Sequence, residues 1–136
     1  MNLAERAEVT RATLEKFAGK PFEFGVCDCG LVVISHLKAM GWKIRTGGTW
    51  KSALALKRFL RRHGGTGAAC IDGWGLSRIA PAMAIVGDIV EMQGETEFGS
   101  FGVCVGNGRV MAFHEDAEGV AIIQPTGLPI ISAWRA

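Results

Sequence analysis

Residues 29–40 are apolar on nearly every side of a helix, which limits the folds open to this chain. A helix that is apolar all round has to be buried, so the run predicts a central helix covered by other elements. Asp28 precedes it and is a preferred N-cap, because its carboxylate accepts N–H groups of the first turn. Gly41 ends the run. We therefore expect a buried helix over residues 29–40, capped by Asp28.

Cys29 would be the first residue of this helix. Its sulfur would lie near the positive end of the helix dipole, which lowers a thiol pKa and favours the thiolate. A nucleophilic cysteine is commonly presented in this way. Cys29 is therefore the candidate nucleophile of the chain.

Helical patterns precede strand patterns along the chain. We expect helices over residues 3–18 and 49–62, the latter capped by Thr49, and a short helix over 72–80. The apolar stripe of the first helix consists of Leu3, Ala7, Val9, Ala12, Leu14 and Phe17. Strands are expected at 87–92, 101–105, 109–113, 119–123 and 130–134, with a hairpin turn at 106–108. This order predicts one α+β domain over residues 1–136 with an antiparallel sheet.

The composition excludes several classes of protein. The chain has 15 Lys and Arg against 13 Asp and Glu, a balance that argues against a dedicated nucleic-acid binder. No run reaches the roughly 20 apolar residues of a membrane span, and no export signal is visible, so we expect synthesis in a cytoplasm. The spacing of Cys27 and Cys29 fits neither a disulfide nor a zinc site, and we expect no metal and no cofactor.

Four stretches resemble the NlpC-type papain-like cysteine peptidases, in particular their small phage tail-associated relatives. They are Phe24-Gly25-Val26-Cys27-Asp28-Cys29, Gly87-Asp88-Ile89-Val90, the segment 101–109, and Ala133-Trp134-Arg135. Their order and spacing cover about residues 20–135. The resemblance implies a papain-like α+β fold in which a Cys at a helix N-terminus packs against a five- to six-stranded antiparallel sheet.

The resemblance also implies where the partners of the cysteine belong. In active members a His begins the second strand, two residues before the Gly that matches Gly102, and a polar residue, often His, lies on the next strand. Ser100 and Ala112 occupy those positions here. A serine hydroxyl cannot accept a proton near pH 7, and general acid–base catalysis contributes roughly 10²–10⁴-fold. His114 would share a face with Ala112 if the strand continued, so it is either a replacement base or a solvent-exposed residue.

Two functions follow from the resemblance. The first is a structural or assembly component of a bacteriophage tail, at the distal tail or tail tip, with a degenerate site. Its partners would be other tail proteins, and it would be assembled in the host cytoplasm and remain in the virion. The second is an active cysteine peptidase or amidase that cleaves peptidoglycan stem peptides during phage entry, with Cys29 as nucleophile and His114 as base. The absence of both expected His residues favours the first.

The sequence allows two roles for several residues. The basic residues of the 49–62 helix form either a phosphate-binding patch or a solvated face. His36 is expected to be a packing or surface residue, and His63 to suit the helix C-terminus. Trp50, Trp74 and Trp134 serve the core or an interface. The high apolar fraction favours a bound subunit, with Trp134 and Arg135 as its first candidate anchor.

Overall fold

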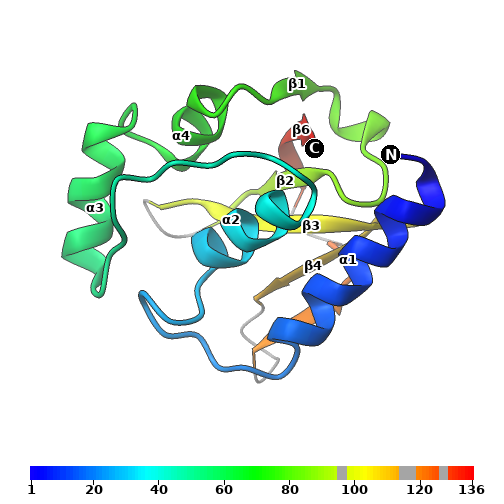
Figure 1. Cartoon of the computed structure of the whole chain (residues 1–136), viewed down its shortest axis with the longest axis horizontal. Helices are drawn as coiled ribbons and strands as arrows, with labels where there is room; N and C mark the ends of the chain where they lie inside the picture. Colours follow the sequence, from blue (N-terminus) through cyan, green and yellow to red (C-terminus); the bar gives the residue numbers. More distant parts are fainter. Residues whose placement is uncertain (95–97, 114–118, 126–128) are drawn as a thin grey trace.

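The computed structural model describes residues 1–94, 98–113, 119–125 and 129–136. Within them the α-helices precede the strands, and the first two helices pack on the sheet (Figure 1). The helices are α1 (Leu3–Phe17), α2 (Cys29–Ala39), α3 (Ala53–Arg62), α4 (Gly67–Gly73) and the 3-10 turn η1 (Pro81–Met83). The strands are β1 (Ser77–Ile79), β2 (Ile89–Met92), β3 (Ser100–Gly106), β4 (Arg109–Phe113), β5 (Val120–Ile123) and β6 (Ile130–Arg135).

The strands form one six-stranded sheet in the order β1-β6-β2-β3-β4-β5, and every neighbouring pair is antiparallel. The predicted α+β fold with an antiparallel sheet is therefore confirmed. The last strand, β6, lies inside the sheet between β1 and β2. None of the helices in the described part of the chain is both long and apolar enough to cross a membrane.

Helix α2 is the buried helix that the sequence predicts. Val33 and Leu37 are buried in the core, and Asp28 caps the helix by accepting the N–H of Leu31 at 2.9 Å. His36 is fully buried on the same helix. Its Nε2 donates to the carbonyl of Gly87 at 2.9 Å, so of the two interpretations of His36 the structure shows packing and not surface exposure.

Helix α1 has the predicted bounds but buries a different face. Arg6, Thr10, Thr13 and Phe17 are its buried residues, whereas Leu3 of the expected stripe is 62% exposed. Residues at these spacings share one side of a helix, so the inner side of α1 is largely polar. It is polar because Arg6 reaches a buried carboxylate under the helix, and Thr13 lies 3.0 Å from the ring of His36.

Two predicted helices are placed differently. Helix α3 begins at Ala53 with Ser52 as N-cap, not at Thr49, because Trp50 is buried outside the helix and donates to Asp28 at 2.7 Å. The short helix expected over 72–80 is wrong. Helix α4 ends at Gly73, and residues 77–79 pair instead with β6 as an edge strand.

The strand predictions agree closely with the sheet. The turn between β3 and β4 is a two-residue hairpin in which Asn107 and Gly108 have φ angles of 55° and 72°. Positive φ at both positions belongs to the type I′ turn, which Asn-Gly favours. Helix α2 packs on β3, which sets the face of β3 that meets Cys29.

Alternate residues of the strands face two separate clusters. The cluster on the helix side includes Ile89, Phe101, Val103, Met111 and Trp134. The cluster on the far side consists of Val90, Met92, Cys104, Val110, Ala112 and Ala133, with partly buried neighbours. Because side chains alternate along a strand, each sheet residue can be assigned to the side of Cys29 or to the far side.

Candidate functional site

Cys29 opens α2 and lies in the wall of a cavity of about 50 Å³. The residue itself is half-buried. The other wall residues are Gly30, Val33, Trp50, Leu56, Phe59, Leu60, Gly67, Cys70, Ile71, Trp74, Phe98 and Phe101. Among these described residues the two thiols are the only side chains that can ionise. The indole N–H of Trp74 is buried and has no hydrogen-bond partner among the described residues.

The environment of Cys29 keeps the thiol protonated. Burial raises the pKa of the Cys29 thiol to about 11, and the negative charge of Asp28 acts in the same direction. Backbone hydrogen bonds from Phe101 and Gly30 favour the thiolate, but they do not offset the loss of water around the sulfur. The expected lowering of this pKa by the helix N-terminus is therefore wrong. Desolvation outweighs the backbone hydrogen bonds to the sulfur at this position.

Asp28 fixes the N-terminus of α2. Besides the N–H of Leu31, its carboxylate accepts the N–H of Gly25 at 2.9 Å and the indole N–H of Trp50 at 2.7 Å. A Cβ at Gly25 would lie 2.1 Å from the carbonyl oxygen of Trp50, so glycine is required there. Asp28 thus joins the loop before Cys29 to the loop before α3.

Gly30 has a similar steric explanation. A Cβ at this position would approach the Trp50 ring to 2.9 Å. A larger residue at this position would therefore not fit without a shift of this indole. Trp50 occupies the corresponding space, and its ring packs on Phe59 of α3 at a centroid distance of 4.8 Å.

Ser100 does not share a face with the residue that meets Cys29. Phe101 belongs to the helix-side core and lines the cavity beside Cys29, whereas Ser100 alternates with it. Ser100 lies on the same face of β3 as Gly102. A Cβ at Gly102 would meet Val110 on the far side of the sheet. Phe101, and not Ser100, therefore lines the cavity together with Cys29.

No histidine in the described part of the chain lines the cavity. His114, the candidate base, lies outside the described residues. Ala112, which occupies the position of the second expected partner, belongs to the far-side cluster. His63 caps the C-terminus of α3 as predicted: its Nδ1 donates to the carbonyl of Phe59 at 2.8 Å.

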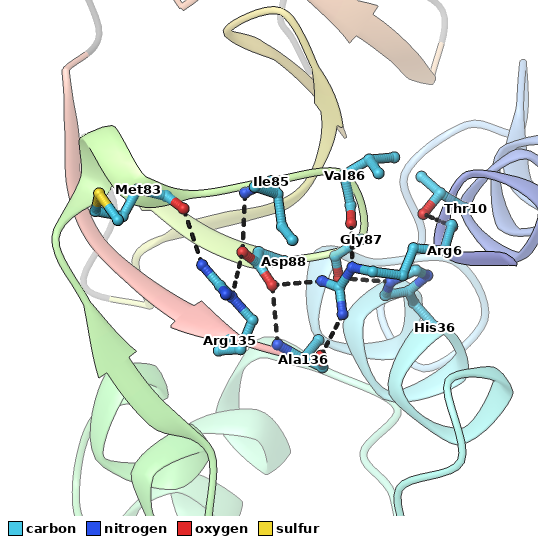
Figure 2. A network of polar contacts seen from close by, with 10 residues as sticks. All are labelled: Arg6, Thr10, His36, Met83, Ile85, Val86, Gly87, Asp88, Arg135 and Ala136. Atoms are coloured by element: carbon cyan, nitrogen blue, oxygen red, sulfur yellow. Dashed lines mark hydrogen bonds and ion pairs between the residues drawn. The ribbon is translucent and has the colours of Figure 1, made fainter. Parts of the chain in front are cut away.

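The Gly87-Asp88 motif forms a structural network (Figure 2). Asp88 is fully buried, and its carboxylate accepts the N–H groups of Ile85 at 2.9 Å and Ala136 at 3.0 Å. Arg6 donates to it at 2.6 Å and Arg135 at 3.0 Å. Arg6 also donates to the carbonyls of Val86 and Ala136. The motif therefore joins α1, β2 and the last residues of β6.

The prediction that Trp134 anchors an interface at the surface is wrong. Its side chain is completely buried, because β6 is an inner strand of the sheet, and its indole N–H donates to Asp72 at 2.8 Å. The adjacent Arg135 is half-exposed and is held by Asp88 and the carbonyl of Met83. Neither residue is arranged as the centre of an exposed interface.

The remaining cysteines are also poor nucleophiles. Burial raises the pKa of Cys70 to about 11 and also raises the pKa values of Cys27 and Cys104. In the described ranges no three His, Cys, Asp or Glu side chains gather as a set that could hold a metal ion.

Sequence reasoning missed the aromatic wall of the cavity and the burial of Arg6. The alternation of Phe101 with Ser100 carried a signal for the first, because only one of two adjacent strand residues can face the helices. The pairing of Arg6 with Asp88 crosses 82 positions of the sequence and left no local signal.

Comparisons with known proteins agree with this fold. The family described as "Domain of unknown function (DUF6950)" matches residues 1–136. A search of curated proteins found no match. Among solved structures, the chain is similar to the structure of NlpC2 from Trichomonas vaginalis, with 14% identity and a TM-score of 0.55. The likeness covers 97% of this chain and 47% of that one, so this chain spans about half the length of the protein it matches. The fold is thus NlpC-like.

Proposed function

This chain belongs to the DUF6950 family, and we propose that it is a non-hydrolytic, NlpC-like structural component of a bacteriophage tail. In this proposal it is made and assembled in the bacterial host cytoplasm and remains in the virion. It contacts other proteins of the distal tail or tail tip.

The lining of the Cys29 cavity, which holds Phe101 but no base among the described residues, carries the non-hydrolytic part of the proposal. A cysteine peptidase needs a base beside the thiol to form the thiolate and an acid to protonate the leaving amine. Phe101 supplies neither, and the pKa of the Cys29 thiol is raised to about 11. At neutral pH a thiol with this pKa is thiolate in only about one molecule in 10⁴. Peptide hydrolysis at a useful rate is not expected from such a site.

The tail assignment draws its support from the sequence. The stretches at 24–29, 87–90, 101–109 and 133–135 resemble phage tail-associated members of the NlpC superfamily, and the fold is NlpC-like. A domain can keep its attachment to an assembly after its chemistry is lost, because the interface and the cleft are separate features of one fold.

Two measurements test the two parts of the proposal. Purified protein is incubated with peptidoglycan stem peptides beside an active NlpC-type peptidase, and cleavage is followed by mass spectrometry. We expect no cleavage above that of the Cys29→Ala variant. Phage particles are purified separately and fractionated, and we expect the chain in the tail fraction. Turnover that Cys29→Ala abolishes contradicts the first part, and absence from the particles contradicts the second.

An active peptidase is the second candidate, and the placement of the thiol favours it. Cys29 lies at the N-terminus of α2 and receives backbone hydrogen bonds from Phe101 and Gly30. His114 would then be the base in this proposal. If stem peptides are cleaved, His114→Ala should abolish the cleavage and Ser100→Ala should leave it intact.

A further inference from the structure

The charges of this chain are strongly divided along the sequence. Residues 29–71 contain no Asp or Glu but hold eight of the 15 Lys and Arg residues. These are Lys38, Lys43, Arg45, Lys51, Lys57, Arg58, Arg61 and Arg62. The rest of the chain carries seven basic and all 13 acidic residues, a net charge of −6. The near-neutral total therefore hides a basic region attached to an acidic remainder.

Helix α3 presents part of this basic region on an outward face. Leu54, Arg58, Arg61 and Arg62 are exposed and follow the i, i+4, i+7, i+8 spacing of one helix side. Leu54 is 58% exposed. The opposite side of α3 is buried, and Leu60 there lines the Cys29 cavity. In Figure 1 the helix lies at the margin of the molecule.

The arginines of this face have no carboxylate partner in the described residues. Arg58, Arg61 and Arg62 form no ion pair there, unlike Arg11 and Arg78, which pair with neighbouring acids. Like charges three and four residues apart on a helix repel one another. The helix dipole compensates Arg61 and Arg62 in the last turn, but it does less for Arg58 in the middle of the helix. An acidic ligand would relieve this repulsion.

We propose that the outward face of α3, defined by Leu54, Arg58, Arg61 and Arg62, binds a short acidic segment of a partner protein. Guanidinium groups bind carboxylates in a bidentate manner, and Leu54 offers an apolar contact beside them. A nucleic acid fits less well, because this face carries no aromatic side chain for stacking bases. A long polyanion would also meet the net negative remainder of the molecule. The proposal does not depend on the proposed function.

The test is binding of a fluorescein-labelled Glu-rich peptide with one central Leu, followed by fluorescence anisotropy at low and at physiological salt. The variant Arg58→Gln/Arg61→Gln/Arg62→Gln should bind the peptide about tenfold more weakly or worse, since three charge contacts are lost. The matched control Arg11→Gln/Lys20→Gln/Arg109→Gln makes the same change in net charge at exposed positions elsewhere. It should bind within about twofold of the unmodified chain.

Competition decides between kinds of partner. Unlabelled Glu-rich peptide should displace the labelled peptide at a lower concentration, counted per negative charge, than single-stranded DNA or vesicles of anionic phospholipid. Leu54→Ser should weaken the Leu-containing peptide several-fold and leave an all-Glu peptide unchanged. Equal losses in both triple variants, no binding at low salt, or tighter binding of DNA or vesicles would each overturn the proposal. Circular dichroism of the α3 variant verifies that the loss is not due to unfolding.

Discussion

Replacing the buried Asp88 with Asn, which removes one negative charge, should strongly destabilise the fold. All four groups around the carboxylate are donors: the N–H groups of Ile85 and Ala136, Arg6 and Arg135. An Asn at this site keeps one acceptor oxygen and turns an NH₂ group toward donors. It also removes the only carboxylate paired with Arg6 in the described residues.

The structure sets the size of the loss. Asp88 is fully buried and Arg6 is 6% exposed, so the variant leaves a buried guanidinium without its counter-charge. Breaking a buried pair in this way costs about 3–5 kcal/mol. Arg6 keeps two carbonyl acceptors, and Arg135 is half-exposed, so we expect about 3 kcal/mol. Against a total stability of about 5–15 kcal/mol for a domain, this is a large share.

Urea unfolding followed by tryptophan fluorescence measures this loss, because Trp50 and Trp134 are buried. The matched control is Asp72→Asn, which affects an exposed pair with Arg78 and keeps an acceptor for Trp134. It should cost about 1 kcal/mol or less. If Asp88→Asn costs no more than Asp72→Asn at an unchanged dependence on urea, the argument for a buried charge network is refuted.

Three further predictions concern the site and its supports. Phe101→His should lower the pKa of the Cys29 thiol by at least about one unit, because an imidazole would then line the cavity beside the sulfur. Ser100→His should not lower it. The pH dependence of alkylation by iodoacetamide measures the thiol pKa in the two variants. Burial lowers the pKa of His36, so the unfolded chain binds a proton first as pH falls. Stability should therefore fall below about pH 6.5, by up to about 1.4 kcal/mol per pH unit, in urea unfolding at several pH values, and His36→Gln should flatten this dependence. Gly25→Ala should cost about 2 kcal/mol or more in the same assay, because its φ is 78° and its Cβ would strike the Trp50 carbonyl.

Each of these has a clear contrary result. Equal effects of the two His substitutions would mean that Phe101 does not face Cys29. Stability that is constant between pH 7 and pH 5 would contradict the neutral state of His36 in the fold. A Gly25→Ala variant as stable as the parent would show that the loop before α2 can move away from Trp50.

The elements that the sequence predicted well are those with local causes. Asp28 and the apolar run after it define α2, and Asn107-Gly108 defines the β3–β4 turn, because caps and tight turns depend on neighbouring residues. The start of α3 was less certain from local signals. Both Thr49 and Ser52 are good caps, and the burial of Trp50 beside Asp28 decides between them.

The parts that could not be predicted depend on the order of the strands in the sheet and on the face of the strand that each residue occupies. Nothing local shows that β6 enters the sheet between β1 and β2, so Trp134 could be read as a surface residue. At the site, a shift of one residue moves a side chain to the other face of a strand. The resemblance therefore directed attention to Ser100, while Phe101 holds the position that faces Cys29.

The network around Asp88 has a consequence for the order in which the protein can form. Arg6 belongs to α1, whereas Ala136 is made 130 residues after it. Until then the Arg6 guanidinium lacks its acceptor on Ala136, and Asp88 lacks Arg135. Trp134, in the strand between β1 and β2, is also missing. Long-range contacts of this kind slow folding. The sheet should therefore close only once β6 is in place, and a sheet that lacks β6 should be a substrate for chaperones.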